Sequence, residues 1–440
     1  MTPPRNAHAP AWTYLFHADV AFEASTPRED RLVQGARRDG GRRVIVRAGP
    51  ARDALVASRD LWGAALFAPR DLSERDLARL GFAYVRRFAL FPRATRARWF
   101  VPLGDANLSA AALRALATPY RPQGRALAAL ASLALRTAGP LLRGSELWIA
   151  SREMPPVELE LARILGRAPA AVGLASGGWG LRHTPTVVAL DVHGVPLAFA
   201  KLAGSERSRR LVMHEARVLE ALASRDGLRD AVPRLLYAGL IDGTFANVQT
   251  PLAGKPGPAH LSAEHERFLS ALSDGERRDA TASELVGTLR RRALEHGGEF
   301  VPLLTRAIEA LADARLPRTV VHGDFAPFNL RLRDRRLHAF DWENACLDGL
   351  PLIDLIHHEC QVGFLLRGWD VRAARRALDR IAAERARDGL SPVRVRALQA
   401  VYLLDMYLRR LDGGHGEDSP LTRKYVHLLR HVAPKLGAVA

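Results

Sequence analysis

The sequence predicts an α+β protein with three successive parts: a small α/β module, a segment rich in short strands, and a long helical segment. Short apolar runs separated by turns, at residues 172–174, 186–190 and 197–202, indicate a β-meander. Apolar residues at helical spacing over 261–316 and over most of 371–436 indicate helices. With 440 residues the chain is longer than one typical domain, which also favours several parts.

The first part, residues 1–150, has the signals of an α/β module but no chemical motif. It holds neither paired carboxylates nor histidines and cysteines at the spacing of metal ligands. We therefore expect an accessory role, in which residues 1–150 present a substrate or bind a protein partner. The expected strands are Ala11–Phe22, Arg43–Arg47 and Trp99–Leu103, and the expected helices are Asp71–Leu80 and Ser109–Leu116.

The third run of the meander contains an unusual cation, Lys201. Only four of the 64 lysines and arginines are lysines, and Lys201 lies in the middle of an apolar run. A compact ammonium can reach between the α- and β-phosphate oxygens of a nucleotide. The alternative is that Lys201 lies on an edge strand and extends to solvent. The helix predicted over Ser208–Leu222 carries Glu215, the natural partner of this lysine, with Glu220 as the competing candidate.

A glycine-rich turn joins the first two runs of the meander. Backbone amides in such a turn can approach phosphates because no Cβ intervenes. The turn does not match the G-x-G-x-x-G pattern, so an ordinary turn is the alternative. After a further predicted strand, Phe245–Thr250, the composition of Pro251–Gly257 indicates a linker. The candidate phosphate-binding residues in the turn are Ser176, Gly177, Gly178 and Gly180.

The segment Val320–Ala345 carries polar residues in an order that suits phosphoryl transfer. Asp324 and Asn329 are five positions apart, as in the protein-kinase catalytic loop, where the aspartate orients a hydroxyl group and the asparagine holds Mg²⁺. Two short apolar runs around a charged turn at 330–339 predict a hairpin, which would return Asp341 to the neighbourhood of Asn329. Amide and carboxylate oxygens are ligands that Mg²⁺ accepts. The alternative is that these are ordinary turn residues.

The motifs HGDFAPFN, FDWENA and PLIDL resemble those of the aminoglycoside phosphotransferase and choline kinase family. The resemblance implies that Asp324 is the catalytic residue and that Asn329 and Asp341 bind magnesium. It also implies that Asp354 braces the catalytic loop. We expect His322 in this motif to be structural, through packing and hydrogen bonding.

Members of this family have a bilobal protein-kinase-like fold. The resemblance implies a β-rich N-lobe at 152–254 and a helical C-lobe at 255–440, and it does not cover residues 1–150. It places the acceptor-binding wall in the C-terminal helices. There Asp405 and the tyrosines of Leu398–Leu411 are candidates for holding the acceptor, although aromatic residues at helical spacing are more often core residues.

The expected activity is transfer of the γ-phosphate of ATP to a hydroxyl group of a small molecule, with Mg as the metal. GTP remains an alternative nucleotide, and a sugar, an amino alcohol or an aminoglycoside is the expected acceptor. Peptide acceptors are less expected because nothing resembles an activation segment between Asp341 and Asp354. Two other hypotheses remain: a catalytically silent kinase-like scaffold that recruits partners through residues 1–150, and a nucleotidyl transferase on the same fold.

Composition and charge narrow the classes of partner and of cellular location that we expect for this protein. The net charge is +17, but the arginines are spread along the chain without a basic block interleaved with aromatics, so we expect no nucleic-acid partner. The two cysteines form neither a disulfide framework nor a structural zinc site, and they fit a cytoplasmic protein. The most apolar helical run, Ala126–Leu135, is too short to span a bilayer, so we expect no transmembrane segment.

Overall fold

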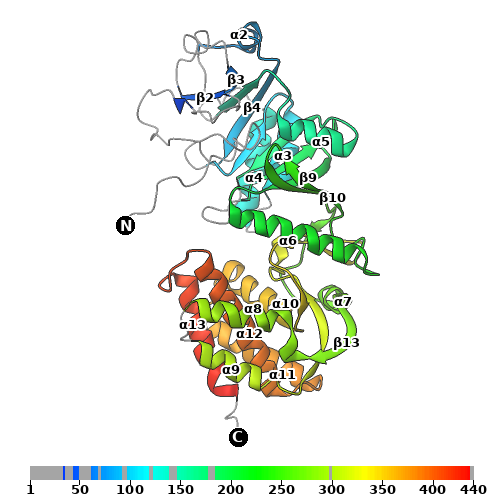
Figure 1. The fold of residues 1–440 in the computed structure, drawn as a ribbon, viewed down its shortest axis with the longest axis vertical. Helices are drawn as coiled ribbons and strands as arrows, with labels where there is room; N and C mark the ends of the chain where they lie inside the picture. Colours follow the sequence, from blue (N-terminus) through cyan, green and yellow to red (C-terminus); the bar gives the residue numbers. More distant parts are fainter. Residues whose placement is uncertain are drawn as a thin grey trace. The chain divides into compact units, whose positions relative to one another are not determined.

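The structure of the protein is a computed structural model. It describes residues 33–34, 43–48, 61–67, 71–91, 97–117, 122–137, 146–176, 184–296 and 300–436. The chain forms two compact units, residues 1–216 with 235–251 and residues 217–234 with 252–440 (Figure 1). The strand expected at Ala11–Phe22 lies outside the described residues.

An eleven-stranded sheet, counted over the described residues, forms the centre of the first unit. Its order is β1-β2-β3-β6-β4-β5-β7-β8-β9-β11-β10, with neighbours antiparallel except for the parallel pair β2 and β3. The strands are β1 (Val33–Gln34), β2 (Arg43–Ala48), β3 (Leu61–Phe67), β4 (Tyr84–Phe91), β5 (Trp99–Pro102), β6 (Glu146–Ser151), β7 (Ala171–Ala175), β8 (Thr186–Leu190), β9 (Pro196–Leu202), β10 (Leu235–Ile241) and β11 (Thr244–Gln249).

The predicted meander is confirmed in β7, β8 and β9, which pair in chain order. The strands expected in the N-terminal module at Arg43–Arg47 and Trp99–Leu103 are also confirmed, as β2 and β5. Five strands of this sheet were not predicted: β1, β3, β4, β6 and β10. In β4 the consecutive residues Arg86 and Arg87 break the apolar pattern, and their guanidinium groups pair with the buried Glu158 and Glu146.

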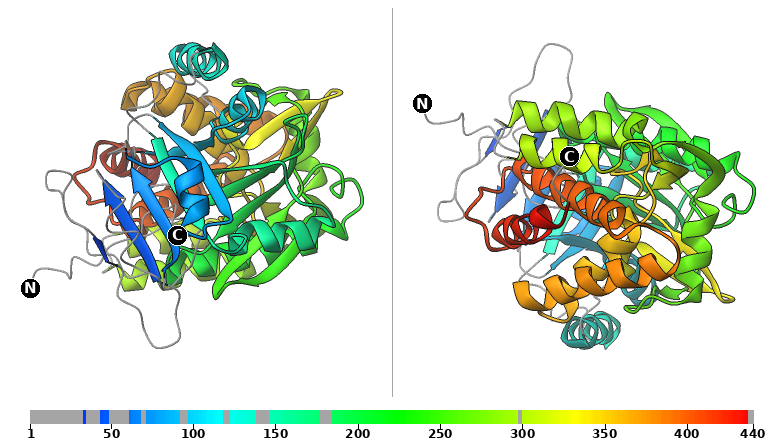
Figure 2. Two further views of the ribbon diagram at one scale, coloured as in Figure 1. Left: turned by 90° about the horizontal axis from the view of Figure 1, so that it is seen from above. Right: turned by 90° about the horizontal axis from the view of Figure 1, so that it is seen from below.

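The strands of the N-terminal module and those of the meander belong to one sheet, because β5 pairs with β7 through Phe100 and Leu174. In Figure 2 the blue strands lie at one side of this sheet and the green strands at the other. At the junction, a Cβ on Gly173 of β7 would lie 3.0 Å from a methyl carbon of Leu116 and 3.2 Å from the Cβ of Ala112. The close approach of helix α3 to β7 therefore suits a residue without a side chain. The division of the chain at residue 150 remains a prediction.

Two helices of the first unit, α2 and α3, begin with side-chain caps. In α2 the Ser73 hydroxyl accepts from the backbone of Asp76, whose carboxylate accepts from the backbone of Ser73, which is a capping box. The Asp105 carboxylate caps α3, and α5 ends at Gly166 with φ of 66°. No helix among the described residues is both long enough and apolar enough to cross a membrane. The helices are α2 (Glu74–Arg79), α3 (Ala106–Leu116), α4 (Pro122–Thr137), α5 (Pro156–Leu165) and α6 (Glu206–Ala223), and α6 continues into the second unit.

The second unit is mainly helical, as predicted, with two small sheets. One sheet has the order β12-β15-β16 and the other β13-β14-β17. Its helices are α7 (Ala263–Ala271), α8 (Glu284–Glu295), α9 (Val301–Glu309), α10 (Ile353–Gln361), α11 (Val371–Arg387), α12 (Pro392–Asp412) and α13 (Pro420–Val432). Its strands are β12 (Lys255–Pro256), β13 (Ser273–Asp279), β14 (Arg315–Val321), β15 (Leu330–Arg333), β16 (Arg336–Ala339) and β17 (Cys346–Gly349).

The prediction that residues 261–316 are helical was wrong at β13 and at the start of β14. All seven residues of β13 are polar or glycine, and six of them are exposed, so the strand has no apolar pattern that a sequence could reveal. It forms because its backbone pairs with β14, for example at Arg278 and Leu316. Long-range pairing determines the structure here, and local periodicity does not.

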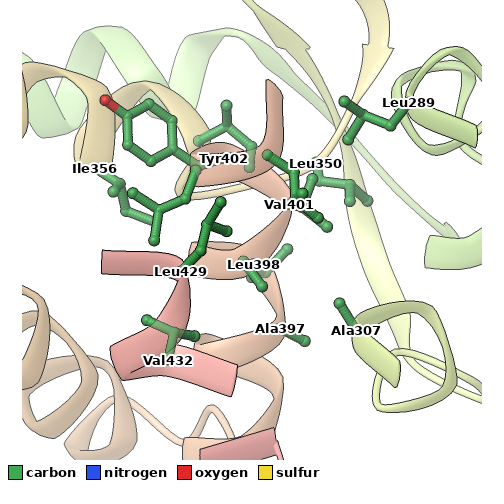
Figure 3. Packing of buried hydrophobic residues seen from close by; sticks show 14 of the residues in the cluster. Leu289, Ala307, Leu350, Ile356, Ala397, Leu398, Val401, Tyr402, Leu429 and Val432 are labelled. Carbon is green, nitrogen blue, oxygen red and sulfur yellow. The ribbon is translucent and has the colours of Figure 1, made fainter. Parts of the chain in front are cut away.

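Helix α12 lies at the centre of the apolar core of the second unit. Seen from below in Figure 2, it lies beside the orange and red helices α11 and α13. Figure 3 shows Leu398 and Tyr402 of α12 close to Leu429 of α13 and Ile356 of α10. Tyr402 is 1% exposed. Helix α10 is thus fixed on a closely packed core, and the residues that hold the candidate site come from this helix.

Candidate active site

The catalytic-loop motif directly follows β14 and is held by α10. The backbone N–H groups of His322 and Gly323 donate to the two carboxylate oxygens of Asp354, at 2.7 and 3.0 Å. Asp354 lies in the first turn of α10 and is buried. Burial raises the pKa of its carboxyl group, against the lowering effect of His322 and of the two N–H donors. These are the contacts expected of a residue that braces the loop.

Gly323 allows the loop to lie against the segment that follows Asp341. Its φ of 77° is in the left-handed region, and a Cβ there would overlap the carbonyl oxygen of Asn344. The guanidinium of Arg409 on α12 bridges the two segments, donating to the Gly323 oxygen at 2.9 Å and to the Asn344 oxygen at 3.3 Å. Arg409 also pairs with Asp405 at 2.7 Å. The two segments are therefore fixed to each other through α12.

Both ring nitrogens of His322 are used in structural hydrogen bonds. Nε2 donates to the carbonyl oxygen of Phe340 at 3.0 Å, and Nδ1 accepts from the backbone N–H of Asp324 at 3.2 Å. The ring is fully buried and packs on Trp342, with centroids 4.3 Å apart. Burial lowers the pKa of this imidazole and so favours its neutral form. The geometry suits a residue that links the loop to the hairpin.

Asp324 presents a carboxylate that is 31% exposed and hydrogen-bonded on both oxygens. Oδ2 accepts from Nδ2 of Asn329 at 2.9 Å, and Oδ1 accepts from Nε2 of His357 at 3.0 Å. Burial acts to raise the pKa of Asp324, but the hydrogen bond and charge of His357, together with His322 and Asn329, lower it below its usual value. Asp324 is therefore ionised at neutral pH.

The predicted hairpin is confirmed in β15 and β16, which pair from Leu330 opposite Ala339 to the turn. One further hydrogen bond, from the N–H of Phe340 to the carbonyl oxygen of Asn329 at 3.0 Å, extends the pairing. This brings Asp341, the next residue, to the end of the hairpin at which Asn329 lies. Asp341 has a φ of 69°, which is uncommon for a residue with a Cβ, although aspartate adopts it more readily than most.

The donor atoms of Asn329 and Asp341 fit Mg²⁺. Because Nδ2 of Asn329 donates to Asp324, the amide oxygen Oδ1 is the atom that can ligate a cation. Asp341 adds a half-buried carboxylate. In the described part of the chain, no three His, Cys, Asp or Glu residues gather as metal ligands. Mg²⁺ characteristically binds one or two protein oxygens and completes its shell with water and phosphate oxygens, so this small ligand set suits it.

Lys201 and Glu215 form a buried ion pair in the first unit. Nζ of Lys201 on β9 lies 2.8 Å from Oε2 of Glu215 on α6, and their side chains are 12% and 0% exposed. Asn247 on β11 fixes the glutamate by donating from Nδ2 to Oε2 at 3.2 Å. Glu220, the competing candidate, is exposed on the same helix. Of the two candidates, Glu215 is the one that contacts Lys201.

The glycine-rich turn is described only at its first residue. Ser176 follows β7, is buried, and donates its backbone N–H to the carbonyl oxygen of Arg98 at 2.8 Å. Gly177, Gly178 and Gly180 lie outside the described residues. Their expected contact with phosphates remains a prediction.

Residues 186–398 match the model of a phosphotransferase enzyme family. The chain is therefore similar to that family over this region. The match spans β8 and β9 of the meander, the Lys201 pair, the catalytic loop and the hairpin, and it confirms the family expected from the sequence. The phosphotransferase region has the α+β, protein-kinase-like fold predicted for it, with strands β8 to β11 before Pro251 and, after it, mainly helices with two small sheets.

Several solved structures are similar at low identity. A thermostable mutant of aminoglycoside phosphotransferase APH(4)-Ia has 17% identity and a TM-score of 0.42, covering 64% of this chain and 100% of that chain. A fructosamine-3-kinase from Haemophilus somnus has 13% identity and a TM-score of 0.42, covering 64% and 97%. A choline kinase from Cryptosporidium parvum has 12% identity and a TM-score of 0.39, covering 63% and 95%. No curated protein matches the sequence significantly.

Three residues that hold the candidate site were not predicted from the sequence: His357, Arg409 and Asn247. His357 follows Asp354 by three positions, so the two share one face of a helix, and this spacing could have indicated it. Asn247 is a polar residue between the apolar residues Ala246 and Val248 of a strand, which is a signal of a buried hydrogen bond. Arg409 had no such signal, because arginines are common along the whole chain.

The residues of α12 that were candidates for holding the acceptor have structural roles. Asp405 is buried and pairs with Arg292 at 2.8 Å as well as with Arg409. Tyr402 is fully enclosed in the core, and the hydroxyl of Tyr407 donates to Glu417 at 2.9 Å. The alternative for the aromatic residues, that they belong to the core, describes Tyr402 better.

Proposed function

We propose that this protein is a phosphotransferase that moves the γ-phosphate of ATP, or of GTP, to a hydroxyl group of a small molecule. The observation that supports this most strongly is the arrangement at Asp324. A partly exposed carboxylate is held on both oxygens, in a loop braced by Asp354, within a region of the phosphotransferase family. An aspartate in this position can orient a hydroxyl group for in-line attack.

The chemical step needs only one acidic or basic group from the protein. The acceptor oxygen bonds to the γ-phosphorus, the bond from that phosphorus to the bridging oxygen breaks, and the nucleoside diphosphate leaves. The hydroxyl proton passes to the carboxylate of Asp324. The lowered pKa makes Asp324 a weak base, which suits a loose transition state in which the proton moves late. Positioning and electrostatic stabilisation would supply most of the rate.

Residues other than Asp324 would hold the nucleotide and the metal. Lys201, oriented by Glu215, would bind the α- and β-phosphates, and the turn beginning at Ser176 would lie over them. The amide oxygen of Asn329 and the carboxylate of Asp341 would hold Mg²⁺. When bound, the metal supplies positive charge that neutralises the phosphate oxygens.

The acceptor we propose is a small hydroxyl compound such as a sugar, an amino alcohol or an aminoglycoside. Support comes from the segment between Asp341 and Asp354. It forms β17, which pairs with β14, so the segment is used within the fold and does not resemble a peptide-docking activation segment. We also propose a cytoplasmic location, for which the two free cysteines, Cys346 and Cys360, are the support.

For residues 1–150 we propose an accessory role, in substrate presentation or in binding a protein partner. The pairing of β5 with β7 supports close coupling of this segment to the strands that carry Lys201, because they share one sheet. A partner bound to the module would act on the same sheet.

A thermal-denaturation experiment tests nucleotide and metal binding. We expect ATP with Mg²⁺ to raise the melting temperature by ligand linkage, and we expect Asp341→Ala to lose the part of the shift that depends on Mg²⁺. Asp334→Ala is a matched control, because Asp334 lies in the turn of the same hairpin with its side chain 83% exposed. No stabilisation of the wild type by ATP and Mg²⁺ would contradict the proposal.

A turnover screen tests the alternative of nucleotidyl transfer. In this screen the mass of the product separates phosphate transfer from AMP transfer.

A further inference from the structure

His357 lies directly behind the catalytic carboxylate. It is on α10, its side chain is 2% exposed, and Nε2 is 3.0 Å from Oδ1 of Asp324. Asn329 donates to the other oxygen, Oδ2, at 2.9 Å. The carboxylate is therefore held from two sides, once by the loop that carries it and once by a helix.

The same helix fixes both the backbone and the side chain of the catalytic residue. Asp354 and His357 are one turn apart on α10. Asp354 binds the backbone N–H groups of His322 and Gly323, which immediately precede Asp324. His357 binds the Asp324 side chain. Because α10 packs on the core helix α12, these contacts connect the reacting group to the buried apolar core of the unit.

Packing alone does not explain why position 357 holds a histidine. Its Nδ1 is buried, and within the described residues it has no hydrogen-bond partner. A buried polar atom without a partner is costly, and such atoms in native structures need a separate reason. The ring meets Tyr402 edge-on, with centroids 5.8 Å apart, an environment that an apolar side chain would suit at least as well. The contact with Asp324 is the feature of this position that only a hydrogen-bond donor provides.

We propose that His357 is a positioning residue for phosphoryl transfer, which fixes the carboxylate plane of Asp324 so that it meets the acceptor hydroxyl. This inference rests on the proposed function. A carboxylate held by Asn329 alone can rotate about its terminal bond, and the second donor stops that rotation. Nε2 must carry the proton, because an ionised carboxylate oxygen only accepts. A donor also weakens Asp324 as a base, which a loose transition state tolerates.

Three variants of His357 and one matched control test the role. His357→Gln keeps an N–H donor at about the position of Nε2, His357→Asn keeps the same amide on a shorter chain, and His357→Leu removes the donor. The control is His358→Leu. His358 is the neighbouring buried histidine of α10, and its Nε2 faces the carbonyl oxygen of Pro258 at 3.3 Å.

The readout is kcat and KM for ATP, with an acceptor from the turnover screen and with the folded fraction measured by circular dichroism. We expect His357→Leu and His357→Asn to lower kcat about 10- to 100-fold, because small misplacements of a reacting group have effects of that size. We expect KM for ATP to stay within about twofold, and His357→Gln to recover most of kcat. The control should change the melting temperature without changing kcat per folded molecule.

Three results would overturn the inference: a His357→Leu variant with normal kcat, a His357→Gln variant as slow as His357→Asn, or a raised KM for ATP in these variants with kcat unchanged. If His357→Leu does not fold, the kcat values of His357→Gln and His357→Asn decide whether the inference holds. If the wild type turns over no acceptor and gains no stability from ATP, the proposed function fails. The positioning role is then decided by crystal structures of the wild type and His357→Leu, in which an unchanged Asp324 carboxylate plane would refute it.

Discussion

Two buried histidines beneath the catalytic loop should make the second unit sensitive to acid. His265 on α7 and His358 on α10 are fully buried, with ring centroids 4.7 Å apart. The ring of His265 also meets Phe325, the residue after Asp324. Burial, together with the charge of His260, lowers the pKa of His265 to about 4. Burial and the charge of His265 lower the pKa of His358 to about 3. Both therefore stay neutral in the folded protein at pH values where free histidine is protonated.

The sign and size of the effect follow from proton linkage. An unfolded histidine has a pKa of about 6.5, so below that pH the unfolded state binds more protons and the free energy of unfolding falls. With folded pKa values of about 4 and about 3, each histidine lowers the free energy of unfolding by about 2 kcal/mol between about pH 7.5 and about pH 5. The pair lowers it by about 4 kcal/mol, a large share of a typical domain stability of about 5–15 kcal/mol.

Urea denaturation at the two pH values, followed by tryptophan fluorescence, measures this difference. His358→Leu removes one of the two groups, so the loss of stability between the two pH values should fall by about half. An unfolding free energy that differs by less than about 1 kcal/mol between the two pH values would refute the reasoning, as would an unchanged loss in His358→Leu.

Three further substitutions test single contacts. Glu215→Ala should destabilise the protein by about 2–3 kcal/mol, because it leaves the largely buried ammonium of Lys201 unpaired, and should weaken ATP binding about tenfold in a titration. Glu220→Ala, on the exposed face of the same helix, should do neither. Gly323→Ala should abolish turnover and lower the melting temperature, because φ is positive and the Cβ would overlap a backbone carbonyl; a normal rate would contradict this. Gly173→Ala should destabilise the sheet junction by about 1–3 kcal/mol by overpacking, which an unchanged urea midpoint would disprove.

Much of the chain from β7 onward could be predicted from the sequence because its signals are local. The apolar runs of β7, β8 and β9 are short and bounded by turn residues. The hairpin at 330–339 and the helices after residue 371 also have clear periodicity. The pairing of Lys201 with Glu215 followed from kinase chemistry, and the structure contains the pair.

The parts that could not be predicted depend on contacts between residues far apart in the chain. Strand β13 is polar throughout, so only its pairing with β14 makes it a strand. The junction of β5 with β7 joins residues about 75 positions apart in sequence, and no local pattern marks it. The contact between His357 and Asp324 is of the same kind, since it depends on where α10 lies after folding.

The most direct test of the central claim is transfer of labelled γ-phosphate from ATP to a hydroxyl acceptor, in a screen of small alcohols, amino alcohols, sugars and aminoglycosides. Asp324→Asn is the decisive variant, because it keeps the shape of the side chain and its contact with Asn329 but cannot take the hydroxyl proton. We predict a phosphorylated acceptor with the wild type and a rate lower by at least about 100-fold with Asp324→Asn at normal ATP binding. Equal rates for the two proteins, or labelled product from neither, would contradict the account.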